Sequence, residues 1–145
     1  MKKFLFIALC AMSLSACADD SKVITFEELP ATAQTLLLQY VQAQDIMIVT
    51  QEGIGFWADY DVVTTDQSQW SFESDGSLES VRVFMGVPSA LVPAPVQATV
   101  EKMYPDAIIV KYSIDKDDRE QDVELNNRIE LTFTLNGALK EVDVD

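Results

Sequence analysis

The residues of this sequence that could do chemistry are almost all carboxylates. The 145 residues include 24 Asp and Glu against 10 Lys and Arg, which gives a net charge of −14, and there is no His. The usual general base and the commonest metal ligand are therefore missing, and catalytic Ser-His and Cys-His pairs are excluded. No glycine-rich phosphate loop is present. The negative charge repels nucleic acid and anionic membrane surfaces, so neither is expected as a direct partner.

The carboxylates themselves do not predict an enzyme. Asp59 and Asp61 alternate with apolar residues, as on the solvated face of a strand, and no neighbour in sequence would shift their pKa values. The acidic run 115–122 is similar to a calcium loop, but Glu120 stands where the EF-hand needs Gly, and the bidentate Glu would fall on Asn126. We expect a non-enzymatic protein without a cofactor or a defined metal site.

The N-terminus has the pattern of an export signal. A basic start at Met1-Lys2-Lys3 precedes the apolar stretch Phe4–Leu14, which is too short to span a bilayer. The following Leu14-Ser15-Ala16-Cys17 resembles the lipobox of bacterial lipoproteins, in which the Cys is acylated and the preceding residues are removed. Ordinary cleavage after Ala18 is the alternative.

Lipidation at Cys17 would place the protein in the cell envelope. By the sorting rules of lipoproteins, Ala18 after the Cys favours the outer membrane, with the protein facing the periplasm or the cell surface. The acyl chains would be its contact with the membrane. The only other cysteine, Cys10, lies in the signal, so no cysteine remains for a disulfide, a metal or thiol chemistry.

An internal repeat predicts the architecture. The hairpin around Asp75-Gly76 recurs around Asn136-Gly137, and both turns are typical of tight hairpins with positive φ at the two central residues. Its matched positions share an offset of 61: 72 and 133, 76 and 137, 78 and 139, 81 and 142, 83 and 144. Five positions of the helix stripe and its leading proline repeat at an offset of 63: 30 and 93, 33 and 96, 36 and 99, 37 and 100, 40 and 103, 41 and 104.

Periodicity then gives the elements of each copy. Each copy reads as one helix followed by four antiparallel strands, which is an α+β fold with both helices on one face of a broad sheet. Strands are expected at 46–51, 55–64, 77–85, 108–114 and 128–135, among others. We expect a signal peptide at 1–16, a lipidated tether at 17–24, a first module at 25–86, a linker at 87–91 and a second module at 92–145. Alternation predicts these inward-facing strand residues: Phe56, Ala58, Tyr60, Val62, Trp70, Phe72, Val81, Val83, Met85, Ile108, Val110, Tyr112, Ile114, Ile129, Leu131, Phe133 and Leu135.

The repeated motifs resemble the PepSY-like domains of exported bacterial proteins. The matching pieces are Leu29-Pro30, Tyr104-Pro105-Asp106-Ala107, Tyr60-Asp61-Val62 and the stretches 72–83 and 133–144. The first copy departs from the pattern, with Tyr40-Val41-Gln42-Ala43 in place of the Tyr-Pro-Asp-Ala break. In architecture the family is similar to the β-lactamase inhibitory protein, whose concave sheet grips an enzyme. The resemblance implies binding of a partner, by analogy of fold.

A mixed aromatic and charged surface is the candidate site. Six residues are expected on the sheet face opposite the core: Trp57, Asp59, Asp61, Glu73, Arg82 and Phe84. Exposed aromatic residues among charges are typical of protein-binding surfaces, although the other module, Phe26 with the tether, or an oligomeric partner could instead cover them. The sequence thus predicts an envelope lipoprotein that binds a protein or peptide, with inhibition as one form. The alternative is a protein that binds a small ligand or divalent cation at the loop 115–122.

Overall fold

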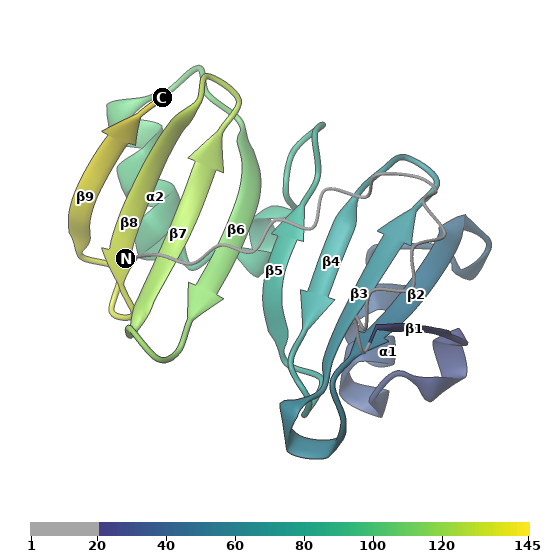
Figure 1. Ribbon diagram of the computed structural model, residues 1–145. Helices are drawn as coiled ribbons and strands as arrows, with labels where there is room; N and C mark the ends of the chain where they lie inside the picture. Colours follow the sequence, from purple (N-terminus) through teal and green to yellow (C-terminus); the bar gives the residue numbers. More distant parts are fainter. Residues whose placement is uncertain (1–20) are drawn as a thin grey trace.

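The computed structural model describes residues 21–145, and this part of the chain forms two α-helices and one sheet of nine strands (Figure 1). Each strand pairs antiparallel with the next in chain order, from β1 to β9. The predicted α+β class, with each helix followed by strands, is confirmed. The predicted signal peptide and Cys17 lie outside the described residues. The elements are β1 (Lys22–Ile24), α1 (Ala31–Leu38), β2 (Ile46–Glu52), β3 (Asp59–Thr64), β4 (Gln69–Phe72), β5 (Leu78–Arg82), α2 (Ala94–Met103), β6 (Ile109–Asp115), β7 (Glu120–Leu125), β8 (Ile129–Thr134) and β9 (Leu139–Val144).

The two helices begin in the same way. Pro30 and Pro93 each stand at the N-cap, immediately before the first helical residue, where a missing N–H costs little. Gln34 then donates its side-chain amide to the carbonyl of Leu29 at 2.8 Å, and Gln97 donates to the carbonyl of Val92 at 2.7 Å. These glutamines are also related by the offset of 63, so the repeat extends to the contacts that hold each helix entry.

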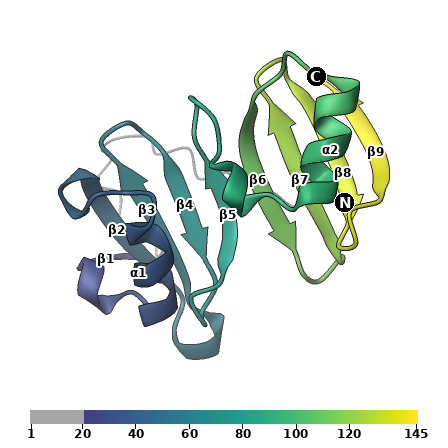
Figure 2. The same ribbon diagram turned by 180° about the vertical axis from the view of Figure 1, so that it is seen from behind.

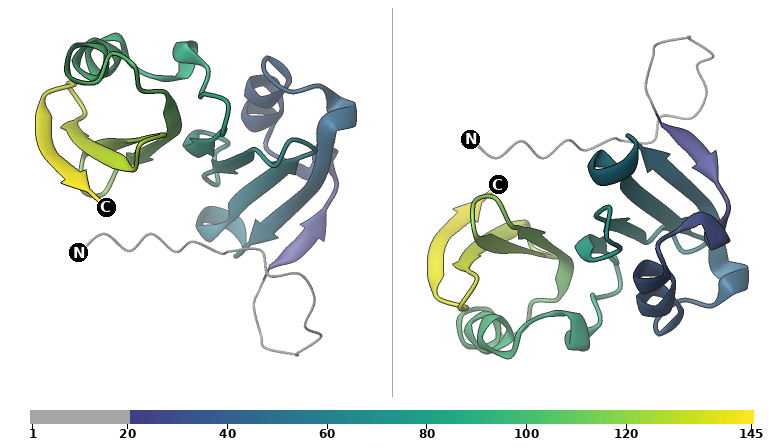
Figure 3. Two further views of the ribbon diagram at one scale, coloured as in Figure 1. Left: turned by 90° about the horizontal axis from the view of Figure 1, so that it is seen from above. Right: turned by 90° about the horizontal axis from the view of Figure 1, so that it is seen from below.

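Both helices cover the same face of the sheet, as predicted (Figure 2). The core between them and the strands is apolar, and its fully buried large side chains include Trp70, Phe72, Phe133, Leu37, Leu125, Leu131, Val62, Val81, Val96 and Val123. Seen along the strands, the sheet of the second module curves around α2, and the opposite face of the sheet carries no helix (Figure 3). No helix of residues 21–145 combines the length and apolar character needed to cross a membrane.

The two hairpin turns close against the helix starts. The Glu73 N–H donates to the Ser77 carbonyl and the Gly76 N–H to the Glu73 carbonyl, both at 2.9 Å. Only the glycine adopts positive φ, +85° at Gly76 and +89° at Gly137. The expectation of positive φ at both central residues was therefore wrong, because a turn followed by a one-residue bulge needs only the glycine in this conformation.

The strand predicted at 55–64 begins later, at Asp59, and the prediction that Phe56 faces the core was wrong. A short 3₁₀ turn occupies Gly55–Trp57, and Phe56 is 96% exposed. Gly55 has φ of +63°, which lies outside the strand region, so extended pairing starts only beyond the turn. Phe56 and Trp57 extend the alternating pattern of β3 in the sequence, but in the structure they belong to the turn before the strand.

The strand predicted at 77–85 ends early, at Arg82, and the inward prediction for Met85 was also wrong. Met85 is 90% exposed, because the chain turns at Phe84–Met85 and the Gly86 N–H bonds back to the Val83 carbonyl at 3.0 Å. Ile108 and Leu135, also expected inward, lie just outside β6 and β8 and are partly exposed. Alternation fails at strand ends because the next residues belong to turns.

Two segments outside the expected modules have regular structure. Lys22–Ile24, within the expected tether, forms β1, which pairs with β2 and brings the sheet to nine strands. The expected linker contains the 3₁₀ turn Ser89–Leu91, which the offset of 63 relates to the 3₁₀ turn Phe26–Glu28. The second copy therefore starts with the same local structure as the first.

Gly76 provides a test of how the turn packs. A Cβ at Gly76 would lie 2.9 Å from Pro30 Cβ and 3.0 Å from Ala33 N. We predict that Gly76→Ala lowers the free energy of unfolding by about 2–4 kcal/mol, from backbone strain plus this clash. The matched control is Gly55→Ala, because its φ is also positive but nothing lies within 4 Å of the new Cβ; it should lose only about 1 kcal/mol. Urea unfolding checks both, and equal losses would contradict the packing argument.

Candidate functional site

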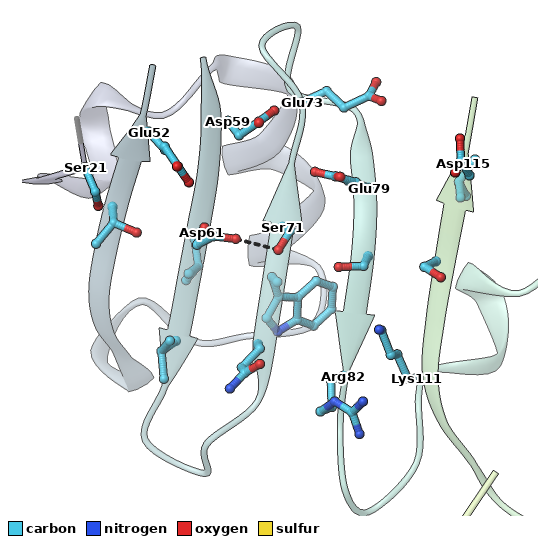
Figure 4. A pocket seen from close by; sticks show the side chains of 18 of the residues that line it. Ser21, Glu52, Asp59, Asp61, Ser71, Glu73, Glu79, Arg82, Lys111 and Asp115 are labelled. Atoms are coloured by element: carbon cyan, nitrogen blue, oxygen red, sulfur yellow. Dashed lines mark hydrogen bonds between the residues drawn. The ribbon is translucent and has the colours of Figure 1, made fainter. Parts of the chain in front are cut away.

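The face of the sheet opposite the helices carries a polar groove (Figure 4). The groove has a volume of about 600 Å³, and apart from Ser21, which precedes β1, its lining residues come from strands β2 to β6, from Glu73 just after β4 and from the turn after β6. It therefore crosses the junction of the two modules, where β5 pairs with β6. Its polar and charged lining residues are Ser21, Thr50, Glu52, Asp59, Asp61, Gln69, Ser71, Glu73, Glu79, Ser80, Arg82, Lys111, Ser113, Asp115, Lys116 and Asp117.

The floor of this face is a row of small polar residues in direct register. Because side chains alternate along a strand, the residues beside buried core positions point to the open face. Cross-strand pairing connects one such residue per strand from β2 to β9: Thr50, Asp61, Ser71, Ser80, Ser113, Asp122, Thr132 and Glu141. Short hydroxyl side chains at the centre of the row leave room above them, which gives the groove its depth.

The row contains one polar pair twice. Ser71 Oγ donates to Asp61 Oδ1 at 2.5 Å, and Thr132 Oγ1 donates to Asp122 Oδ1 at 2.5 Å. The offset between the pairs is again 61, so the duplication carries a polar pair as well as the core. Asp122 and Thr132 are buried, whereas Asp61 and Ser71 line the groove.

Carboxylates gather at one end of the groove (Figure 4). Burial, followed by repulsion from Asp59, Glu73 and other carboxylates, raises the pKa of Glu79 to about 7. Burial, and then the nearby Asp61 and Glu52, also raises the pKa of Asp59. The carboxylates at the acidic end are therefore partly buried and repel one another, and a cation placed there would relieve the repulsion.

The opposite end of the groove is basic. Arg82 Nη2 lies 2.8 Å from Glu124 Oε2, and Arg82 Nη1 lies 3.3 Å from Glu124 Oε1, so the guanidinium is held by both oxygens. Lys111 is the cross-strand neighbour of both residues. Burial, and secondly the charge of Arg82, lowers the pKa of Lys111. The groove is thus polarised from carboxylates to cations along the strand direction.

A second ion pair connects the modules at the acidic end. Lys116 Nζ, in the turn after β6, bonds Glu73 Oε2 and the hydroxyl of Ser77, the latter at 3.0 Å. Ser77 Oγ in turn donates to Glu73 Oε2 at 2.8 Å. Together with the Arg82–Glu124 pair, this contact ties the first module to the second on the open face, on both sides of the β5–β6 junction.

Four of the six sequence-predicted residues line the groove: Asp59, Asp61, Glu73 and Arg82. Trp57 and Phe84 do not. Both are exposed, but β3 and β5 run in the same direction, so the residue before β3 and the residue after β5 lie at opposite ends of the strands. The structure therefore separates the two aromatic residues by the length of the groove, and their part in binding stays a prediction.

Sequence reasoning missed several groove residues, chiefly Glu79, Lys111 and Ser113. A signal for the last two was present, because Val110, Tyr112 and Ile114 were assigned inward and their neighbours must point outward. Glu79 had no such signal. The register shifts between Ser71 and Phe72 opposite it, and alternation cannot be read through a bulge.

Within residues 21–145, no three carboxylate or other metal-ligating side chains converge in a way that could hold a metal ion. The run 115–122 is a hairpin tip: β6 ends at Asp115, residues 116–119 form the turn, and β7 starts at Glu120. Its tight turn is closed by the Asp118 N–H, which donates to Asp115 Oδ1 at 3.0 Å. Glu120 forms an ion pair with Lys140.

The fold and the groove define a class of protein: a tandem helix-plus-sheet protein with a long open sheet face. Residues 58–141 match the family described as "Putative beta-lactamase-inhibitor-like, PepSY-like". The chain belongs to this PepSY-like family, which confirms the resemblance seen in the sequence. A comparison with curated proteins gives no match.

Solved structures of similar proteins come from Bacteroides. One, from Bacteroides thetaiotaomicron, is described as a "putative calcium-regulated periplasmic protein"; it is 32% identical over 88% of this chain and 99% of its own, with a TM-score of 0.78. A second, a "putative periplasmic protein" from Bacteroides vulgatus, is 30% identical over 88% and 99%, with a TM-score of 0.80. A third, also from Bacteroides vulgatus, shares the fold at 20% identity over 85% and 98%, with a TM-score of 0.77. Relatives of this chain are therefore described as periplasmic.

The raised pKa of Glu79 predicts a pH dependence of stability. The folded-state pKa of about 7 exceeds the ordinary value of 4.5, so the native state holds this proton more tightly than the unfolded state. Stability from this group is present below pH 4.5 and is lost as pH rises to about 7. In Glu79→Gln we expect the decline between pH 5 and pH 7.5 to shrink by about 1 kcal/mol, less than the full shift implies because the side chain is partly solvated. Urea unfolding at both pH values measures it, and an unchanged slope would contradict the prediction.

Proposed function

We propose that this protein is a non-enzymatic lipoprotein of the cell envelope that binds a protein or peptide in the groove of its open sheet face. The observation that carries the proposal is the groove itself, which crosses from the first module onto β6 of the second and is charged at both ends. The periplasmic descriptions of the relatives support the envelope location. The motif ending at Cys17 supports a lipid anchor, and Ala18 supports the outer membrane.

The chemistry of the groove favours a polypeptide over a small organic ligand. Pockets for small molecules are mostly apolar and bury most of the ligand, whereas this groove is floored by hydroxyls and ringed by charges such as Asp59, Glu79 and Lys111. A polypeptide can present a cationic side chain to the acidic end and a carboxylate or carbonyl to the basic end. Such complementarity steers association and fixes register. The family description, with its words "beta-lactamase-inhibitor-like", supports inhibition of the bound partner as one form of the proposed binding.

Capture from envelope extract tests the groove. The full lipidated chain, purified in detergent, serves as bait with light cross-linking. We expect the double charge reversal Asp59→Lys plus Asp61→Lys to reduce recovery of the captured protein at least tenfold, because it inverts the acidic end. The control is Glu101→Lys on α2, an exposed residue on the other face of the sheet, which should leave recovery unchanged.

A captured protein that binds both variants equally well would refute the groove as the site. Once identified, the partner's own activity with and without this protein tests inhibition directly. The exposed aromatic residues enter the same experiment through Trp57→Ala and Phe84→Ala, each measured alone because the two lie at opposite ends of the groove.

Calcium binding is the second candidate, and one observation favours it: the relative that is 32% identical is described as calcium-regulated. If the acidic run 115–122 binds calcium, calorimetry should show sub-millimolar binding that Asp117→Asn abolishes. Glu101→Gln, remote from the run, should bind as the unaltered protein does. No heat of binding up to millimolar calcium would remove this candidate.

A further inference from the structure

The outer strand β9 is unlike every other strand of the second module. All six of its residues, Leu139–Val144, are exposed, and among residues 21–145 no strand pairs with its outer side. It forms the outer edge of the sheet (Figure 1). An open edge presents unpaired backbone donors and acceptors, which can take up a further strand.

The internal repeat shows what the same edge does in the first module. The offset of 61 relates β5 to β9, with Val81 matching Val142 and Val83 matching Val144. The outer side of β5 is paired antiparallel with β6, in the register Val81↔Tyr112 and Arg82↔Lys111. The chain therefore contains one copy of this edge with a strand docked on it and one copy without.

Burial shows the consequence of the missing strand. Val81 is 0% exposed, whereas Val142 is 37% exposed. Val144 is 73% exposed, although its counterpart Val83 packs against the core. A strand added along β9 would cover this apolar row, as β6 and the chain before it cover its counterpart. Hydrophobic burial would then add to the backbone hydrogen bonds.

The backbone of β9 is oriented for such pairing. The Val83 N–H donates to the Val110 carbonyl of the following module at 2.9 Å. Val83 matches Val144, and one residue further on the Asp145 N–H donates to the carbonyl of Arg128, the residue before β8, at 3.4 Å. Successive N–H groups of a strand point in opposite directions, so the N–H of Val144 points outward, as that of Val83 does.

The charges of β9 select the occupant. Glu141 and Asp143 stand on the open face, in register with Thr132 and Glu130 of β8. The one cation of the strand, Lys140, is held by Glu120. A second copy of β9 would set carboxylates against carboxylates, which is destabilising across strands. A strand with a basic residue opposite Asp143 and a large apolar residue opposite Val142 meets both requirements.

We propose that β9 is a docking edge that takes up an extended basic segment of a partner protein by antiparallel strand addition. This docking edge is separate from the groove, so the proposal can be confirmed or refuted independently of the proposed function. Its acidic residues have two consequences: they exclude a second β9 and attract a strand that carries Lys or Arg.

The chain supplies a suitable probe, a synthetic peptide with the sequence of residues 109–115. This peptide is β6, the strand that pairs with β5, and its Lys111 would face Asp143. Titrated into the full ¹⁵N-labelled chain in detergent, it should cause saturable amide shifts confined to β8 and β9. A peptide with Lys111→Asp, and Asp143→Lys in the protein, should each weaken binding about fivefold, the scale of a cross-strand charge pair. Combining the two changes should restore binding.

Two controls make the test decisive. Lys22→Glu, on the opposite edge strand β1, should leave the affinity unchanged. The same peptide N-methylated at alternate residues cannot complete the hydrogen-bond ladder and should not bind. Shifts that map to β1 or to the groove, binding that survives N-methylation, or concentration-dependent shifts of β9 without peptide, which would reveal a β9–β9 dimer, would each overturn the proposal. If Asp143→Lys disturbs folding, the substituted peptide alone still decides it.

Discussion

The pairing of β5 with β6 is the interaction on which the rest of the structure depends. It turns two small modules into one sheet, because the register Ser80↔Ser113 and Val81↔Tyr112 continues the ladder from one copy to the next. It also covers Val81, which would otherwise be as open as its counterpart in the second copy. The junction also places β6 beside β5, so residues of the second module line the groove next to those of the first. The ion pairs Arg82–Glu124 and Lys116–Glu73 then hold the junction on its polar side.

Electrostatics explains how a chain with such an excess of acid can form this face. The cations concentrate where the modules meet: Arg82, Lys111 and Lys116 all line the groove. They offset part of the repulsion there, but burial and then the remaining repulsion from the neighbouring carboxylates raise the pKa of Glu79 to about 7. The chain has no His, but the raised pKa brings Glu79 into the neutral pH range. A partner that brings a cation to Glu79 would gain Coulomb energy and also release the proton that burial and repulsion retain.

Much of the fold could be predicted from the sequence because the repeat, the proline before each helix and the Asp/Asn-Gly turns act locally. Errors occurred where a tertiary contact or a turn outweighs the local pattern, as at Phe56 in the 3₁₀ tip and at Met85 beyond β5. The site was harder to predict. Asp59, Asp61, Glu73 and Arg82 followed from alternation, but Glu79 lies opposite a bulge. Alternation placed Ser71 and Ser113 on the open face, but only the cross-strand register shows that they lie in one row across the groove floor.

The two copies have the same plan but opposite surfaces, and this difference has a physical cause. The equivalent pairs Asp61–Ser71 and Asp122–Thr132 keep the same 2.5 Å hydrogen bond, yet the second is buried while the first lines the groove. Asp59 of the first copy matches Glu120 of the second, which Lys140 neutralises. Conversely, the outer edge is covered in the first copy and open in the second. The repeat supplies two similar frameworks, and pairing them edge to edge through β5 and β6 covers the outer edge of the first copy and leaves that of the second, β9, open.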